Sequence, residues 1–241
     1  MHVILTGATG LVGSGVLDAM LKTKDITKIS ILSRRPVPMA TDSKDPRVNV
    51  IIHNDFATYK PEVLRELAGA RGCVWALGIS QNKDYTLEAA KAFSTLAGEG
   101  EEPFRFIYVS GEGATQSPGR FSPIFARVKG ETETALGEMS TKISTLQADS
   151  VRPAFVDAAA HEAIQRYIPD PGAMYRGMIT VLGPPMRAFY KSGHSPTPIL
   201  GDFLTKMAMG KVDGQIEGPG AFRLGGSWIV ENVGFRRVMG L

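Results

Sequence analysis

The sequence predicts a doubly wound α/β fold, in which a parallel sheet carries helices on both faces. Short apolar runs alternate with helical patterns from residue 2 to residue 151, which is typical of a parallel sheet with crossover helices. The first apolar run ends in a turn with glycines at positions 7, 10 and 13, and a helical pattern follows. A chain of 241 residues is long enough for one such domain with a sizeable core.

The apolar runs place six strands in order along the chain, at about 2–6, 28–33, 48–52, 72–78, 104–110 and 143–151. The patterns between them predict helices at about 11–23, from 61, 87–97 and 122–139. Pro61 suits a first helical turn, because the backbone N–H that proline lacks would be unpaired there.

Beyond the sixth strand, prolines and glycines become frequent between about 154 and 200. We expect an irregular cap there, over the carboxyl ends of the strands, where open α/β sheets bind ligands. Further helices are predicted at 201–209 and 228–239, the second capped by Ser227. Because no linker divides the chain, residues 1–241 are expected to form a single domain.

The composition is that of an ordinary globular protein, with 43% apolar and 21% charged residues and a net charge of +3. Lys and Arg are scattered, which argues against nucleic-acid binding, and the four histidines lack metal-site spacing. Cys73 is the single cysteine, so we expect a core residue and no internal disulfide. Because the chain runs directly into a strand and has no membrane-length apolar run, a cytoplasmic protein without a membrane span is expected.

The glycine turn predicts a dinucleotide site. Gly7 allows the tight turn, Gly10 lets a pyrophosphate approach the backbone, and Gly13 lets the helix pack close to the strand. The free N–H groups of the helix start favour phosphate. The residues expected to contact the cofactor here are Thr6, Gly7, Thr9, Gly10, Leu11, Val12 and Gly13.

The end of the second strand predicts which dinucleotide binds. An NAD site usually has a carboxylate there for the ribose 2′-OH, whereas this chain has Ser33, Arg34 and Arg35. A hydroxyl and two guanidiniums suit a 2′-phosphate. NADP(H) is therefore favoured over NAD(H); the alternative is a solvated basic loop.

Five motifs in order carry a resemblance to a known family. They are 6–13, Asn54-Asp55, Tyr108-Val109-Ser110-Gly111, Lys129-Gly130-Glu131 and Val151-Arg152-Pro153. Together they resemble the atypical short-chain dehydrogenases/reductases, a Rossmann-fold family whose members include proteins similar to nucleoside-sugar epimerases.

The resemblance implies further contacts to an NADP(H) cofactor. Asp55 would lie near the adenine, with a solvated turn aspartate as the alternative. The loop after the fourth strand would border the cofactor through Leu77 and Gly78, while Lys129 would bind the nicotinamide ribose and Ser110 would lie beside it.

The same resemblance implies a catalytic Ser, Tyr and Lys, with the Tyr four residues before the Lys. Ser110 and Lys129 match this pattern, but Phe125 occupies the tyrosine position. A phenyl ring cannot exchange a proton, so the proton donor of the usual reduction is missing. A Phe125→Tyr change would place a phenol one helical turn from Lys129.

Other residues are candidates for the missing acid. Glu112 lies two residues after Ser110, and Tyr85 or Tyr175 would approach from loops. Alternatively, the substrate requires only a hydride and water. Structural alternatives remain for Ser110, as a hydroxyl capping a turn, and for Lys129, as a surface lysine paired with Glu133.

We therefore expect an NADP(H)-dependent oxidoreductase or isomerase acting on a small, fairly apolar carbonyl compound. The alternative is a catalytically silent NADPH-binding regulator or scaffold that acts through a protein partner. No metal is expected, and a homodimer is left open.

Overall fold

The predicted doubly wound sheet is confirmed by the structure, a computed structural model that describes residues 1–78, 83–98, 102–170, 172, 183 and 190–241. The main sheet has the order β3-β2-β1-β4-β5-β6-β10-β9, and all neighbours pair in parallel except β9 and β10. Its strands are β1 (His2–Thr6), β2 (Lys28–Ser33), β3 (Val48–Ile52), β4 (Ala70–Trp75), β5 (Phe104–Val109), β6 (Leu146–Arg152), β9 (Ala221–Leu224) and β10 (Ser227–Glu231).

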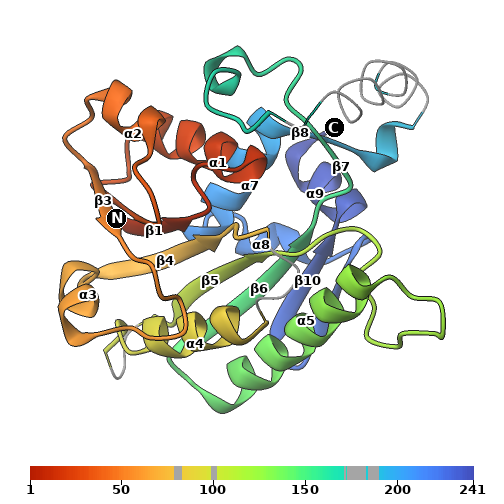
Figure 1. Cartoon of the computed structure of the whole chain (residues 1–241). Helices are drawn as coiled ribbons and strands as arrows, with labels where there is room; N and C mark the ends of the chain where they lie inside the picture. Colours follow the sequence, from red (N-terminus) through yellow and green to blue (C-terminus); the bar gives the residue numbers. More distant parts are fainter. Residues whose placement is uncertain (79–82, 99–101, 171, 173–182, 184–189) are drawn as a thin grey trace.

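Helices cover both faces of this sheet (Figure 1). One face carries α1 (Leu11–Lys22), α2 (Pro38–Ser43), α7 (Thr197–Ala208) and α9 (Asn232–Met239). The other face carries α3 (Pro61–Glu66), α4 (Lys83–Ser94) and α5 (Ile124–Lys142), and the short α8 (Asp213–Ile216) follows α7.

The β1 sequence explains this layering. Val3 and Leu5 lie in one hydrophobic cluster, whereas Ile4 lies in the other. Successive side chains of a strand point to opposite faces, so a continuous apolar run is buried on both sides. Cys73 of β4 is buried in the second cluster, as expected.

The prediction of one helix over 228–239 was wrong. Residues 227–231 form β10, which pairs with β6, and only Asn232 begins α9. Ser227 does not cap a helix; its hydroxyl donates to the carbonyl of Ala148. The Trp-Ile-Val run is locally compatible with a helix or a strand, and its pairing with the distant strand β6 makes it a strand.

Smaller differences concern element boundaries. The fourth strand is 70–75 rather than 72–78, the next helix begins at 83 rather than 87, and the helix expected at 201 begins at 197. The elements α2, α8 and β9 were not predicted.

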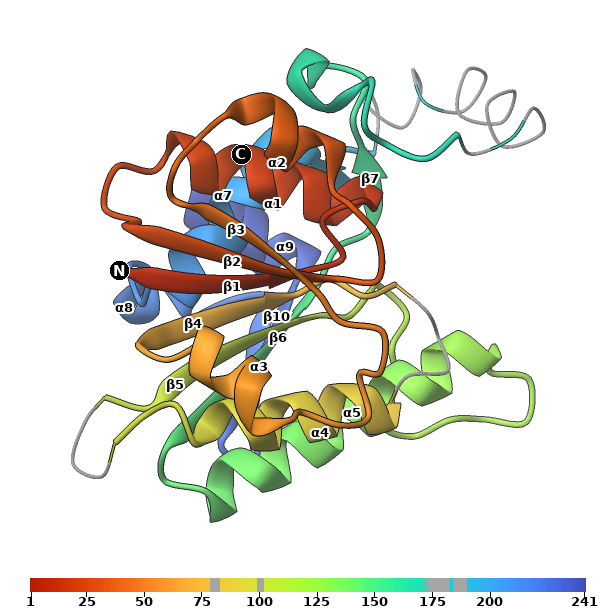
Figure 2. The same cartoon turned by 60° about the vertical axis from the view of Figure 1, so that its left-hand side comes forward.

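The described part of the expected cap lies beyond the carboxyl edge of the sheet (Figure 2). It contains the strand pair β7 (Phe155–Asp157) and β8 (His194–Pro196), with 3-10 turns at Glu162–Ile164 and Lys191–Gly193. His161 ties this segment to the helical layer, because its ring bonds Asp18 of α1 and Thr197 of α7, both at 2.9 Å. The cap is thus anchored to the helix that starts at the glycine turn.

A buried carboxyl makes the stability of the fold depend on pH. Burial raises the pKa of Asp149, in β6, to about 6, although the backbone N–H of Trp228 donates to it at 2.7 Å. Between about pH 4 and about pH 6 the folded protein therefore holds a proton that the unfolded chain releases, so stability falls as pH rises through this window.

Asp149→Asn removes this titration while keeping an acceptor for Trp228. We expect the wild type to lose about 3 kcal/mol relative to the variant between about pH 4 and pH 7. Urea unfolding at several pH values measures the difference, and parallel pH profiles for the two proteins would contradict it.

Candidate active site

The glycine turn joins β1 to α1 at the centre of the sheet. Gly7 has a φ of +71°, and a Cβ there would lie 2.2 Å from the carbonyl oxygen of Ala76. A Cβ on Gly13 would lie 2.0 Å from the carbonyl oxygen of Gly7. The prediction that Gly13 permits close packing of helix against strand is confirmed, because no side chain fits at either position.

The start of α1 suits an anion. Its N-cap is Gly10, which offers no side-chain hydrogen bond, and its first turn holds no acidic residue. The first N–H groups of a helix have no partner within the helix and carry the positive end of its dipole. The buried hydroxyl of Thr6 accepts from the N–H of Ala76 at 3.2 Å and so braces the turn. Contact between Thr6 and a cofactor stays a prediction.

A pocket beside this turn contains the two arginines, and we call it the arginine pocket. Arg35 donates to the hydroxyl of Thr9 at 3.2 Å, and the Ser33 hydroxyl donates to the carbonyl of Arg35 at 2.7 Å. No carboxylate belongs to its described lining, which consists of Gly7, Thr9, Leu32, Ser33, Arg34, Arg35, Phe56 and Leu77. Both guanidiniums are exposed, so they are accessible to a bound anion.

Phe56, rather than Asp55, is the residue after β3 that lines the arginine pocket. Asp55 is exposed, and its carboxylate accepts from the N–H of Ala57 at 3.0 Å, as in a local turn. Phe56 could not be predicted from the sequence, because an apolar residue near a strand end carries no signal of its own.

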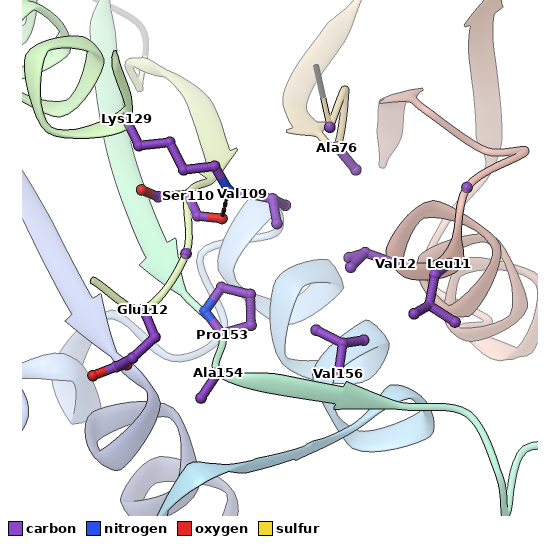
Figure 3. Close-up of a pocket in the computed structure, with 13 residues that line it drawn as sticks. Leu11, Val12, Ala76, Val109, Ser110, Glu112, Lys129, Pro153, Ala154 and Val156 are labelled. Carbon is purple, nitrogen blue, oxygen red and sulfur yellow. Dashed lines mark hydrogen bonds between the residues drawn. The ribbon is translucent and has the colours of Figure 1, made fainter. Parts of the chain in front are cut away.

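A second pocket, the central pocket, borders the start of α1 next to the same turn (Figure 3). Its mainly apolar lining comes from the start of α1, from residues that end or follow β4, β5 and β6, from β7 and from α5: Gly10, Leu11, Val12, Ala76, Gly78, Val109, Ser110, Gly111, Glu112, Lys129, Pro153, Ala154 and Val156. The arginine pocket has a volume of about 450 Å³ and the central pocket about 390 Å³. Both volumes fall within the range of roughly 300–1,000 Å³ for small-molecule sites.

Ser110 and Lys129 are brought together in the central pocket. The ammonium of Lys129 donates to the backbone carbonyl of Ser110 (Figure 3). Burial lowers the pKa of Lys129, and the negative charge of Glu133 partly opposes this. The Ser110 hydroxyl, which is 2% exposed, donates to Glu133 at 2.6 Å.

Two of the other candidate acids, Glu112 and Tyr85, lie among the described residues. Glu112 lines the central pocket, and Figure 3 shows its carboxylate pointing away from Lys129. Tyr85 lies on the first turn of α4, is 37% exposed and does not belong to the described lining of either pocket. Tyr175 lies outside the described residues.

Phe125 also lies outside the described lining of the central pocket. It is in the first turn of α5, one turn before Lys129, and its side chain is 44% exposed. Two neighbours, Phe121 and Ile124, are more exposed still. The ring at the expected tyrosine position therefore faces solvent to a large extent.

Two curated fungal proteins are similar to this chain, although no family model matches it. Botcinic acid biosynthesis cluster B protein 16 of Botryotinia fuckeliana is 48% identical over 155 residues, 64% of this chain and 98% of that protein. The chain belongs to the same family as this protein. Leucinostatins biosynthesis cluster protein T of Purpureocillium lilacinum is 36% identical over 197 residues, 70% of each chain.

Solved structures show that the fold of this family member is that of the short-chain dehydrogenases/reductases. A member from Mycobacterium ulcerans has a TM-score of 0.62 and 13% identity, covering 97% of this chain and 89% of its own. The enzyme WbmF of Bordetella bronchiseptica, solved with NAD⁺, has a TM-score of 0.62 and 11% identity, covering 96% and 72%. The PhqB reductase domain of Penicillium fellutanum has a TM-score of 0.62 and 14% identity; the match covers 86% of this chain but only 64% of that one.

Two further structural findings bear on partners and metals. Among the described residues, no helix is both long enough and apolar enough to cross a membrane. In the same part of the chain, no group of three or more His, Cys, Asp or Glu residues is arranged to hold a metal ion.

Proposed function

We propose that this protein is an NADP(H)-dependent reductase of the short-chain dehydrogenase/reductase type. The observation that carries the proposal is the pair Arg34 and Arg35 beside the uncapped start of α1, with no carboxylate in the described lining. The residues fit the cofactor: the helix start and Gly10 suit the pyrophosphate, and the arginines suit a 2′-phosphate. When bound, the dihydronicotinamide supplies a hydride.

Each pocket is then assigned to one half of the cofactor. The arginine pocket would hold the adenosine half, with Phe56 against the adenine. The central pocket would hold the nicotinamide half and the substrate, with Lys129 at the ribose and the reacting oxygen. Its apolar lining favours a small, fairly apolar carbonyl compound, and the names of the two fungal relatives support a substrate from small-molecule biosynthesis.

Calorimetry tests the cofactor preference. We expect NADPH to bind more tightly than NADH, and Arg34→Ala or Arg35→Ala to weaken NADPH by about 1.5–3 kcal/mol each, the usual loss of a charged hydrogen bond, while NADH is little affected. The matched control is Arg65→Ala, an exposed arginine on α3. Equal affinity of the wild type for both cofactors would overturn the preference.

A silent NADPH-binding regulator remains the second candidate, and the replacement of the usual tyrosine by Phe125 favours it. The two functions differ in turnover. A reductase oxidises NADPH in the presence of hexanal, decanal, benzaldehyde or cyclohexanone, whereas a regulator binds NADPH with the same affinity and leaves all four unchanged.

A further inference from the structure

A carboxylate buried behind the central pocket has four hydrogen-bond donors around it. Glu133 lies on α5, one turn after Lys129, and is 0% exposed. One oxygen accepts from the Ser110 hydroxyl at 2.6 Å and from Arg152 Nε at 3.0 Å. The other accepts from Gln116 at 2.6 Å and from Arg152 Nη2 at 2.6 Å. Such a charged, multiply bonded group is held firmly in place.

This arrangement decides what the Ser110 hydroxyl can do. A hydroxyl has one proton to donate, and here it goes to Glu133. Figure 3 shows the hydroxyl on the side of Ser110 away from Leu11 and Val12. To donate into the pocket, Ser110 would have to give up a hydrogen bond to a buried charge, which is stronger than one between neutral groups.

Lys129 remains as a donor that faces the pocket. An ammonium has three protons, and one is used on the Ser110 carbonyl. The other ionisable side chain in the described lining is Glu112, which as a carboxylate only accepts. Tyr108 is unsuitable, because it is 6% exposed within the core and burial raises its pKa to about 12.

We propose that Glu133, locked by Arg152, is a positioning residue that draws the Ser110 hydroxyl out of the pocket and leaves Lys129 as the catalytic acid. The proposal rests on the proposed reductase function. The substrate carbonyl carbon gains a hydride from NADPH, which is oxidised to NADP⁺, and the carbonyl π electrons move to the oxygen. That oxygen takes a proton from the Lys129 ammonium, and the resulting amine regains a proton from water.

The test compares steady-state NADPH oxidation by the wild type, Lys129→Met and Ser110→Ala with the four carbonyl compounds named above. We expect Lys129→Met to lower kcat by about 10²–10⁴-fold, the usual contribution of a positioned acid, and Ser110→Ala to lower it by less than about tenfold. The matched control is Lys142→Met, an exposed lysine at the far end of α5. A larger loss in Ser110→Ala than in Lys129→Met would overturn the proposal.

The pH profile tests the positioning role of Glu133. Lys129 is faced by Glu133 on its own helix and shares the pocket with Glu112. Because the charge of Glu133 raises the pKa of Lys129, Glu133→Gln should move the alkaline fall of kcat to lower pH, whereas a purely structural defect would lower kcat at every pH. An alkaline limb at the same pH in both proteins would contradict this role of Glu133. If Glu133→Gln does not fold, the comparison of Ser110→Ala with Lys129→Met still decides which side chain is the acid.

NADPH calorimetry on the same proteins separates the two proposals. A wild type that fails to bind NADPH overturns the proposed function. A wild type that binds NADPH but reduces none of the four compounds is the regulator rather than the reductase, and the assignment of Lys129 as an acid falls with the reductase. A wild type that reduces one of them, while Lys129→Met loses less than about tenfold in kcat, overturns the assignment of Lys129 alone.

Discussion

A Gly10→Val variant should fold like the wild type and bind NADPH about 100-fold more weakly or worse, a loss of at least ~2.7 kcal/mol. Gly10 lines the central pocket at the start of α1. A Cβ there would lie 3.3 Å from the Gly7 carbonyl oxygen, which the turn can accommodate with a small shift. The valine methyl groups would instead occupy the space through which a pyrophosphate approaches the backbone.

Gly13→Ala provides the contrast for this prediction. Its Cβ would lie 2.0 Å from the Gly7 carbonyl oxygen, so the turn itself must move, and both stability and binding should fall. Thermal melts followed by circular dichroism, together with calorimetry, measure the two effects. Wild-type NADPH affinity in folded Gly10→Val would remove the glycine turn from the site.

The second large effect is expected from Arg152→Met. Arg152 is 7% exposed and provides the ion pair of the fully buried Glu133. Removing one partner of a buried pair costs about 3–5 kcal/mol, because the remaining charge is left uncompensated. For a chain of this size, that lowers the melting temperature by roughly 6–20 °C.

The double variant Arg152→Met/Glu133→Leu should recover much of this loss, because no buried charge is then left alone. Calorimetric melting of the single and double variants measures both effects. An Arg152→Met protein that melts at the wild-type temperature would show that the pair contributes nothing to the fold.

Local sequence signals account for the parts of the fold that were predicted well. The strand at 2–6, the glycine turn and the following helix are each encoded by neighbouring residues. By contrast, β10 depends on pairing with Ser150, Val151 and Arg152, far back in the chain. Its apolar run fits a helix or a strand, so the sequence alone could not decide between them.

The same distinction applies to the candidate site. The glycines and the arginine pair follow strand ends, and the parallel topology brings such residues to one edge. By contrast, the hydrogen bonds that Ser110, Gln116 and Arg152 donate to Glu133 join three separate segments of the chain. No local sequence pattern predicts these contacts. The spacing of Lys129 and Glu133 suggested a surface ion pair as the alternative, whereas Glu133 is buried with other partners.

The exposure of the Phe125 ring indicates that a tyrosine at this position would not act as the acid. With Lys129 as the acid, Phe125→Tyr should change kcat by less than about tenfold, because the added hydroxyl would lie on a side chain that is 44% exposed. The assay with the four carbonyl compounds measures this change. A gain of about 10²-fold or more would assign the missing acid to this position instead.

A crystal structure of the protein with NADP⁺ bound would decide where the cofactor lies. We expect the 2′-phosphate within hydrogen-bonding distance of Arg34 or Arg35, the pyrophosphate at the start of α1, and the nicotinamide ring in the central pocket beside Lys129. Cofactor density with the 2′-phosphate away from both arginines, or with the nicotinamide outside the central pocket, would contradict it.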